Sequence, residues 1–337
     1  MNATAEITAE INTARCQRVG EALKPLSLKA DFYARPYLNV DAPAETRFRM
    51  HFFAVAICHQ THNLHLRELN LFGWDYLEYV FSALAANDAQ LLRPEYLLHS
   101  DTERLAGELA AVFSATGKPE DTTLDRLSER AGLMRDAASH LINTYRGEVG
   151  KIFEIAHNRL CGSYGLYWLL PEFEAFADPQ QKKSTFLIKL LEEDGLVEIS
   201  DPEHFIPIMD YHMQRVLLRL GCVEVKDQGL RNKLLARETL QTDEPIRGLC
   251  IDAFKIIAGN SDHPVTKMND FFWSLGRSCC HETTLCTDGF CSKNPCTFSQ
   301  IVEAGTHQNC VFQDFCPGAA HPTYRDLWQP VVETHYY

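Results

Sequence analysis

The chain has 337 residues, of which 45% are hydrophobic and 23% are charged, as is ordinary for a globular protein. Its net charge of -13 disfavours a broad basic surface for duplex DNA, because most non-specific affinity for DNA is electrostatic. No apolar run approaches the ~20 residues of a membrane helix and no secretory signal is visible at the N-terminus, so we expect an intracellular protein without a membrane partner.

Apolar periodicity predicts a mostly helical chain, and signals for strands are sparse. In chain order, the expected helices cover residues 4–24, 71–81, a segment that begins at Ser100 with Glu103 in capping-box spacing, 122–145, 149–160, 180–194, 211–220 and 244–258. Residues 47–66 are apolar and aromatic, and we expect a buried segment there that includes Phe52, Phe53 and Val55.

The expected domains follow from breaks in this pattern. Gly117-Lys-Pro-Glu-Asp interrupts the helices and is a candidate boundary between lobes. From about residue 261 the chain is rich in Cys, His, Thr, Asn and Pro and has few periodic apolar positions, so a bound group must hold it. We therefore expect an N-terminal helical lobe over 1–117, a second helical lobe over 118–260, and a Cys-rich metal-binding extension over 261–337.

Asp210 precedes a short amphipathic helix. The apolar positions of this helix share one face, and Gly221 ends the run. The simplest role for Asp210 is an N-cap, in which its carboxylate accepts amide protons of the first turn. The same carboxylate can stabilise the positive charge that develops on a sugar when an N-glycosidic bond breaks. The two roles are compatible, because capping orients the side chain.

The run Pro-Ile-Met-Asp210-Tyr-His-Met-Gln-Arg-Val-Leu-Leu-Arg-Leu-Gly221 resembles the helix-hairpin-helix DNA glycosylases of the endonuclease III superfamily. In that family the catalytic Asp precedes a helix of the form x-His-x-x-Arg-Val-x-x-Arg-Leu, which this chain matches at His212, Arg215, Val216, Arg219 and Leu220. The resemblance implies an all-α fold of two helical lobes with the pocket between them. It also implies an N-glycosylase (a hydrolase) that removes a modified or damaged base from nucleic acid, as in base excision DNA repair.

A second run, Lys182-Lys-Ser-Thr-Phe186-Leu-Ile-Lys189, resembles the Lys-x-x-x-Phe-x-x-Lys run of archaeal oxoguanine glycosylases. The resemblance implies that Lys182 is the nucleophile, or Lys183 if the alignment shifts by one residue, and that Phe186 packs on the base. A lysine that attacks the sugar C1′ forms a Schiff base and adds lyase activity. Such a lysine needs a lowered pKa, from burial or a cationic neighbour. A solvated lysine pair at a helix start is the alternative.

Three further residues are candidates for binding the base, which takes stacking and hydrogen bonds. Gln60 resembles the early glutamine that archaeal oxoguanine glycosylases use on the base, and Trp74 offers a stacking face. Asp252 could supply a second carboxylate. The alternatives are a helix-end hydrogen bond for Gln60, core packing for Trp74 and a solvated helix face for Asp252.

The extension contains seven cysteines: Cys279, Cys280, Cys286, Cys291, Cys296, Cys310 and Cys316. Thiols this dense in an intracellular protein favour metal binding, with disulfides as the alternative. Zinc and an iron–sulfur cluster both fit, since each takes four such ligands. The remaining five cysteines are isolated, and we expect ordinary buried thiols there.

Endonuclease III and its adenine-specific relatives end in Gly-Arg/Ala followed by Cys-x6-Cys-x2-Cys-x5-Cys, and the resemblance therefore favours a [4Fe-4S] cluster over zinc. Here Leu275-Gly-Arg277 leads into Cys279-x6-Cys286, and Cys310-x5-Cys316 resembles the closing pair. The middle spacing differs, because 23 residues that include two more cysteines separate Cys286 from Cys310. Cys280 could replace Cys279, and Cys296 could replace Cys286, so the four ligands remain open.

Two other functions remain open. The family's hairpin normally carries a Gly-x-Gly element whose amides bind DNA phosphate, yet residues 169–178 contain no glycine. This leaves room for the queuosine-salvage branch, which is similar in fold but hydrolyses a free modified nucleotide and also places an Asp-Tyr pair before a helix, as Asp210-Tyr211 does. The third reading is a non-catalytic nucleic-acid-binding scaffold. In each case we expect a monomer, in the cytoplasm or at the nucleoid, whose partner is DNA or a modified nucleotide.

Overall fold

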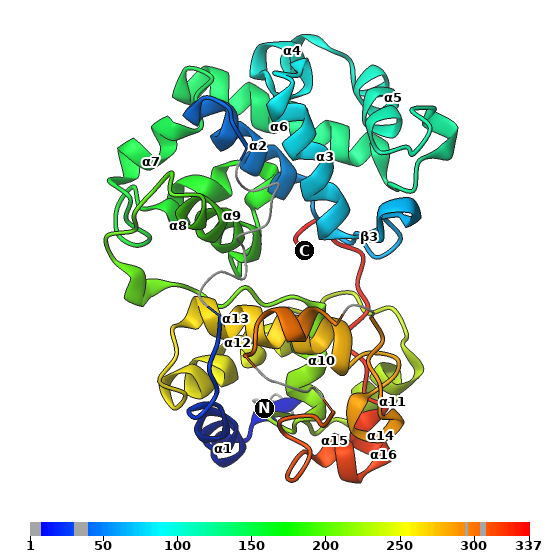
Figure 1. The fold of residues 1–337 in the computed structure, drawn as a ribbon. Helices are drawn as coiled ribbons and strands as arrows, with labels where there is room; N and C mark the ends of the chain where they lie inside the picture. The colour runs from blue at the N-terminus through cyan, green and yellow to red at the C-terminus, as the bar shows by residue number, and fades with distance from the viewer. Residues whose placement is uncertain (1–7, 30–39, 294–295, 304–307) are drawn as a thin grey trace, which may run out of the picture. The chain divides into compact units, whose positions relative to one another are not determined.

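The computed structural model describes residues 8–29, 40–293, 296–303 and 308–337. These residues are mostly helical, which confirms the prediction from apolar periodicity. They form two compact units (Figure 1): unit 1 comprises Met1–Phe32 and Ile206–Glu333, and unit 2 comprises Tyr33–Phe205 and Thr334–Tyr337. In the part of the chain that is described, no helix has both the length and the apolar character needed to span a bilayer.

This division differs from the three consecutive domains expected over 1–117, 118–260 and 261–337. Unit 1 joins the first helix of the chain to the segment with Asp210 and to the Cys-rich extension. Unit 2 contains the two lysines and receives the last four residues of the chain. Neither unit is a continuous stretch of sequence, and composition along the chain cannot show this.

Unit 2 is a helical body with one short hairpin. Its strands are β2 (His65–Leu66) and β3 (Leu71–Phe72), which pair antiparallel. Its helices are α2 (Ala44–Ala56), α3 (Trp74–Ala86), α4 (Pro94–His99), α5 (Thr102–Val112), α6 (Leu127–Tyr145), α7 (Gly150–Ala156), α8 (Leu166–Leu169) and α9 (Lys182–Glu193), with 3-10 turns at Arg67–Leu69, Gln90–Leu92, Pro119–Asp121, Leu170–Glu172, Glu174–Phe176 and Pro202–His204.

The core of unit 2 forms around α2, whose residues 50–56 are all buried. The ring of Phe52 packs against Phe173 and Phe176, with centroids 5.2 and 5.0 Å away. The apolar segment expected within 47–66 is helical as far as Ala56; Gln60 then takes a left-handed conformation (φ 45°) and the hairpin follows. The helix expected from residue 71 begins only at Trp74, after Gly73 turns the chain at φ 56°.

The start of α5 corrects one expectation. The N-cap is Asp101, whose carboxylate accepts the amide of Arg104 at 2.8 Å, and not Ser100. Ser100 instead ends α4, where its hydroxyl donates to the carbonyl of Tyr96 at 2.8 Å. Two adjacent residues can both cap a helix, and only the path of the chain decides between them.

Unit 1 contains the antiparallel strands β1 (Ala9–Ile11) and β4 (Val223–Val225). Its helices are α1 (Thr13–Leu23), α10 (Tyr211–Arg219), α11 (Gln228–Ala236), α12 (Glu244–Gly259), α13 (Val265–Ser274), the π-helix η8 (Leu275–Cys279), α14 (Leu285–Asp288), the 3-10 helix η9 (Thr297–Gln300), α15 (Pro317–Ala320) and α16 (Pro322–Arg325).

The helix expected over 4–24 is shorter than predicted. Residues 4–7 lie outside the described residues, and residues 9–11 form a strand because they pair with β4. Helix α1 begins after Asn12, whose side chain accepts the amide of Arg15 at 3.0 Å. Tertiary pairing therefore overrides the local helical pattern here.

The extension packs within unit 1. Helix α13, which the sequence analysis did not expect, buries Phe271 and Phe272, whose rings contact each other and Phe312. After α13, η8 lies directly on α10: a Cβ built on Gly276 would come within 2.6 Å of the carbonyl oxygen of His212. Only glycine allows this approach, which brings Cys279 and Cys280 to the side of α10.

Candidate functional site

Asp210 caps α10 in the way its position predicts. Its carboxylate Oδ1 accepts the amide of Met213 at 3.0 Å. The residue is 8% exposed, so the carboxylate does not extend into bulk solvent. The capping role is thus established, and a small exposed fraction remains through which a ligand could be reached.

The arginines of the same helix bind the Cys-rich segment. The guanidinium of Arg215 donates to the carbonyls of Gly276 at 2.7 Å and Cys280 at 3.0 Å. Arg219 donates to the carbonyls of His281 at 2.9 Å and Leu327 at 3.0 Å. Both side chains are buried. The two arginines of the Asp210 motif therefore satisfy backbone carbonyls that would otherwise be buried without partners.

The histidine of the motif takes part in the same network. Burial, then the charge of Arg215, lowers the pKa of His212 well below its ordinary value, so the ring is neutral. Because a guanidinium only donates, Nδ1 of His212 accepts from Arg215 at 3.1 Å. Burial lowers the pKa of Arg215 to about 10, which leaves it charged at neutral pH.

Lys182 lies at the start of α9 in unit 2. The carboxylate of Asp178 caps this start, accepting the amides of Gln180 at 3.0 Å and Lys182 at 2.9 Å. The Lys182 side chain is not solvated, as the simplest alternative supposed: its residue is only 9% exposed. Its Nζ lies 3.8 Å from Sγ of Cys58 and 5.0 Å from the ring centroid of Phe186.

Lys183 is buried more deeply than Lys182. Its Nζ donates to the carbonyl of Ala56 at 2.6 Å, and the residue has no exposed surface. Burial, together with the charges of Lys182 and Arg130, lowers the pKa of Lys183 to about 7. Lys183 thus has the lowered pKa that a nucleophilic amine needs but no exposed surface through which a substrate could reach it.

Trp74 and Phe186 come together, as the base-binding hypothesis requires of two such residues. Their rings meet edge to face with centroids 4.7 Å apart. Within the described residues, the indole Nε1 of Trp74 is buried and has no hydrogen-bond partner. Lys182, Phe186 and Trp74 therefore form one group, which the sequence predicted as separate candidates.

Gln60 and Asp252 both contact other residues of the chain, and only Asp252 does so in the way its simpler role proposed. The side-chain oxygen of Gln60 accepts a hydrogen bond from Arg126 at 2.6 Å, and the backbone amide of Gln60 donates to the carbonyl of Tyr337 at 3.1 Å. Asp252 lies on α12 in unit 1 with its side chain 61% exposed and pairs with Lys255 at 3.1 Å. The carboxylate of Asp252 faces solvent, as the alternative reading of this residue proposed.

Two residues of the polar run after α2, to which the sequence alone assigns no role, lie beside the lysines. Cys58, which we expected to be an ordinary buried thiol, contacts Lys182. His59 is completely buried, and neither ring nitrogen has a hydrogen-bond partner among the described residues; Oε1 of Glu129 is 3.6 Å from Nε2. Burial, then the cations Lys183 and Arg130, lowers the pKa of His59, so the ring is neutral. The polar run that follows buried α2 was the available signal.

The cysteines of the extension divide into two groups. All twelve cysteines of the chain lie in the described ranges and are thiols. Cys279, Cys291 and Cys296 bring their sulfur atoms within 4.8 Å of one another and could bind one metal ion. Sγ of Cys279 is 3.7 Å from that of Cys296 and 3.6 Å from that of Cys291. We call these three residues the triad.

The other four cysteines, Cys280, Cys286, Cys310 and Cys316, line a pocket of about 20 Å³, into which Cys279, Arg219 and Arg325 also project. We call these four residues the quartet. Among the described residues, no three quartet sulfurs are as close together as those of the triad. Burial, then the neighbouring thiol of Cys280, raises the pKa of Cys316 to about 11, so the thiol is protonated at neutral pH unless a cation binds.

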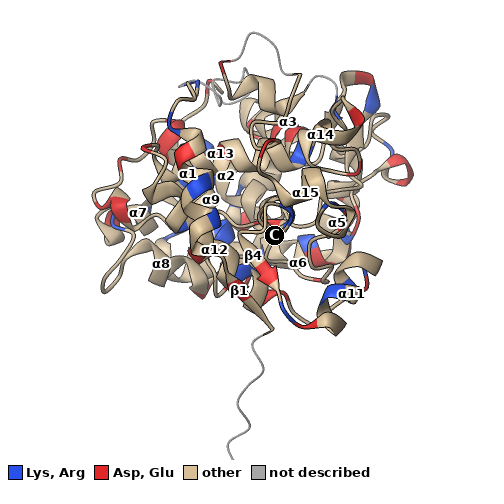
Figure 2. Cartoon of the chain, turned by 90° about the horizontal axis from the view of Figure 1, so that it is seen from below, with Lys and Arg blue, Asp and Glu red and all other residues tan. Residues whose placement is uncertain are grey.

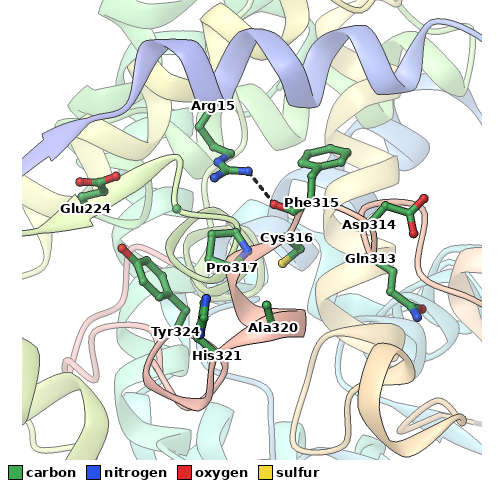
Figure 3. Close-up of a pocket in the computed structure, with 11 residues that line it drawn as sticks. Arg15, Glu224, Gln313, Asp314, Phe315, Cys316, Pro317, Ala320, His321 and Tyr324 are labelled. Carbon is green, nitrogen blue, oxygen red and sulfur yellow. Dashed lines mark hydrogen bonds between the residues drawn. The ribbon is translucent and has the colours of Figure 1, made fainter.

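A larger pocket of about 350 Å³ lies beside the quartet in unit 1 (Figure 3). Arg15 of α1 enters it and donates to the carbonyl of Phe315 at 2.6 Å. Across from Arg15, His321 and Tyr324 belong to the turn that leads through α16. Of the predicted site residues, only Cys316 lines this pocket. Arg15 therefore supports the loop that carries a quartet cysteine.

Charge on the surface is mixed. Figure 2 shows Lys and Arg residues interspersed with Asp and Glu along the helices of both units. Several basic side chains are already paired with acidic ones, such as Lys226 with Glu10 and Glu224, both at 2.7 Å. This mixture of the two signs agrees with the net charge of -13.

Comparison with protein-family models gives no match, and a search of curated proteins finds no similar sequence.

Proposed function

We propose that the protein is an N-glycosylase that removes a modified or damaged base from nucleic acid. The observation that carries the proposal is Asp210: its carboxylate is oriented by the amide of Met213 at a helix start, and the residue as a whole is 8% exposed. A carboxylate fixed in this way can stabilise a sugar as it becomes cationic, without reorganising during the reaction. We further propose that the two helical units are the lobes of the helix-hairpin-helix type.

The group around Lys182 supports a covalent route. In this route Nζ attacks C1′ as the base departs with the bonding electrons and a proton, and opening of the sugar ring then gives a Schiff base. Phe186 and Trp74 would stack on the base, since flat apolar rings beside an amine suit an extruded base. Lys183 is the second candidate nucleophile, because burial lowers its pKa to about 7.

Base release under single-turnover conditions tests the assignment of Asp210. The substrates are duplexes with oxidised, deaminated or alkylated bases and free modified nucleotides. Asparagine caps helices as well as aspartate, so Asp210→Asn keeps the fold and removes only the charge. We expect a loss of about 100-fold or more, the size of effect that removing one electrostatic group has. Asp227→Asn is the matched control, because Asp227 caps α11 in the same unit.

If Asp210→Asn and Asp227→Asn both retain the wild-type rate on every active substrate, the catalytic assignment is wrong. If the wild-type protein binds nucleic acid but releases no base from any substrate, the protein is a non-catalytic scaffold in which Asp210 only caps.

Borohydride trapping tests the lysine. Hydride reduces the Schiff base to a stable amine, and the protein then stays attached to the DNA. We expect trapping by the wild type and by Lys151→Gln, a control at a half-exposed lysine that pairs with Glu154, and none by Lys182→Gln. Trapping that survives in Lys182→Gln and is lost in Lys183→Gln would assign the nucleophile to Lys183. Base release without trapping in the wild type would mean a monofunctional enzyme.

We propose that the quartet holds a [4Fe-4S] cluster. Its donor set fits: four cysteines line one pocket, and no three of their sulfurs lie as close together as those of the triad, which suits a cluster with one iron per thiolate better than a single ion. The pocket measures about 20 Å³, so the loops that carry the four cysteines must move apart to admit the cluster. The cluster would be structural, holding the extension against α10. Such a site suits a reducing cytoplasm.

A second function has one observation in its favour. Residues 166–176 form α8 and two 3-10 turns, and between residues 169 and 178 there is no glycine to present amides to a DNA phosphate. Together with the interspersed surface charge, this favours a small substrate, as in queuosine-salvage-like hydrolysis of a nucleoside or nucleotide. Release of base from a free nucleotide, without activity on any duplex, would select this alternative.

A further inference from the structure

The triad is held in place by a single residue next to one of its members. Ser278 precedes Cys279 and is completely buried. Its carbonyl accepts the amide of Ser292 at 2.8 Å, and its hydroxyl accepts the amide of Thr297 at 3.0 Å. Ser292 and Thr297 follow the other two cysteines of the triad, so Ser278 fixes all three chain segments at the residue beside the sulfur.

A second contact closes the same framework. The hydroxyls of Thr283 and Ser292 are 2.7 Å apart, and that of Ser292 also reaches the carbonyl of Thr283 at 3.2 Å. In metal sites, hydrogen bonds around the ligands hold the ligands in the orientation that the metal needs. The triad therefore has a built frame and is more than a chance meeting of surface thiols.

The sulfur spacing fits one tetrahedral ion. A zinc–sulfur bond of about 2.3 Å places two sulfurs of a tetrahedron about 3.8 Å apart. The sulfur of Cys279 lies 3.7 Å from that of Cys296 and 3.6 Å from that of Cys291. A disulfide needs sulfurs about 2.05 Å apart, and an iron–sulfur cluster separates its thiolates further because each binds a different iron. The spacing therefore selects a single ion over both alternatives.

The triad and the quartet contain adjacent residues, Cys279 and Cys280, whose sulfurs make different contacts. Cys279 ends η8 and joins the triad, whereas Cys280 continues the chain toward α10, where Nη1 of Arg219 is 3.6 Å from its sulfur. The two thiol groups can therefore be filled independently, although Cys279 also borders the quartet pocket.

We propose that Cys279, Cys291 and Cys296 bind one soft divalent cation, zinc, at a site distinct from the quartet, with water or another exchangeable ligand in the fourth position. Among the described residues, no fourth His, Cys, Asp or Glu joins the group. Cys291 and Cys296 are half-buried, so solvent reaches that side of the ion. Zinc with three thiolates and an open position accepts an exogenous ligand, unlike a closed structural site. This proposal does not depend on the glycosylase activity.

Metal content per chain tests the proposal on the full-length protein purified without oxygen. We expect one equivalent of zinc in the wild type. Cys291→Ser and Cys296→Ser lose the zinc and keep whatever iron the wild type holds. Cys286→Ser and Cys310→Ser, in the quartet, keep the zinc. Cys161→Ser changes neither metal, because Cys161 is exposed and lies in unit 2. A wild type without zinc, or triad variants that retain it, would overturn the proposal.

A measurement on the wild type covers the case in which a triad variant does not fold. Thiol alkylation followed by mass spectrometry should leave Cys291 and Cys296 unmodified until a chelator removes the zinc, and should modify Cys161 throughout. Equal modification of all three before chelation contradicts the site. Cobalt in place of zinc tests the open position: added imidazole should change the visible spectrum of the tetrahedral cobalt protein, and an unchanged spectrum would show a closed site.

Discussion

The burial of Lys183 predicts that unit 2 becomes more stable as the pH rises above 7. The side chain has no exposed surface, and its Nζ donates to the carbonyl of Ala56. Its pKa is lowered to about 7, chiefly by burial, from an ordinary value of 10.5. In the unfolded chain the same amine regains the ordinary value, so the unfolded state binds more protons between these two pH values.

The sign and size of the effect follow from proton linkage. Below pH 7 both states carry the proton, and Lys183 contributes no pH dependence. Above pH 7 the folded state has released it and the unfolded state has not, so the free energy of unfolding rises with a limiting slope of about 1.4 kcal/mol per pH unit. Because the slope is only half developed at the folded pKa itself, the gain between pH 7 and pH 9 is about 2 kcal/mol.

Urea unfolding at pH 7, 8 and 9 measures this gain as a difference between the wild type and Lys183→Met. The variant lacks the titrating amine, so the wild type should gain about 2 kcal/mol relative to it across the series. Lys189→Met is the control: Lys189 lies on the same helix and is nearly as buried, but it pairs with Glu193, and this variant should keep the wild-type pH dependence. A wild-type curve parallel to that of Lys183→Met would refute the argument.

Two further substitutions test the packing of each unit. Gly276→Ala should lower the free energy of unfolding by about 1–3 kcal/mol and loosen metal binding, because its Cβ would meet the backbone of His212 at 2.6 Å. Gly259→Ala is the control and should have no such effect, because there is open space around Gly259. Equal stability of the two variants would contradict the close approach at Gly276. Asp194→Asn should cost about 3 kcal/mol at pH 7, because the buried carboxylate pairs with Arg47 and His51. Burial raises the pKa of Asp194, but hydrogen bonds from His51 and Arg47 outweigh burial and lower it overall. The cost of Asp194→Asn should therefore shrink only as acid protonates the wild-type carboxylate. A cost that is constant down to pH 3 would contradict the pairing.

The helices that the sequence predicted well are those whose apolar face is regular. The expected 180–194, 211–220 and 244–258 agree within two residues with α9, α10 and α12. The errors lie where a distant partner decides the conformation. Residues 9–11 form a strand only because β4 offers its edge more than 200 residues later, and no local pattern records this.

The candidate site shows the same limit. The sequence identified seven cysteines but could not choose among them, because chain spacing alone does not say which loops a buried residue such as Ser278 draws together. The structure separates Cys279 from Cys280 although they are adjacent. Likewise, the position of Cys58 against Lys182 depends on how α2 packs on α9 and is absent from either segment alone. Asp210 was predictable, since an N-cap is a local feature.

Helix α10 couples the proposed catalytic carboxylate to the metal-binding segment. Asp210 begins the helix, and Arg215 and Arg219 on it bind the carbonyls of Cys280 and His281. The spacing of His212, Arg215 and Arg219 therefore fixes the rotation of α10 against the cysteine loops. A metal that orders those loops would also hold Asp210 in orientation without touching the substrate. Removal of the metal group proposed for the quartet should therefore slow the proposed base release, although the Asp210 side chain itself is unchanged.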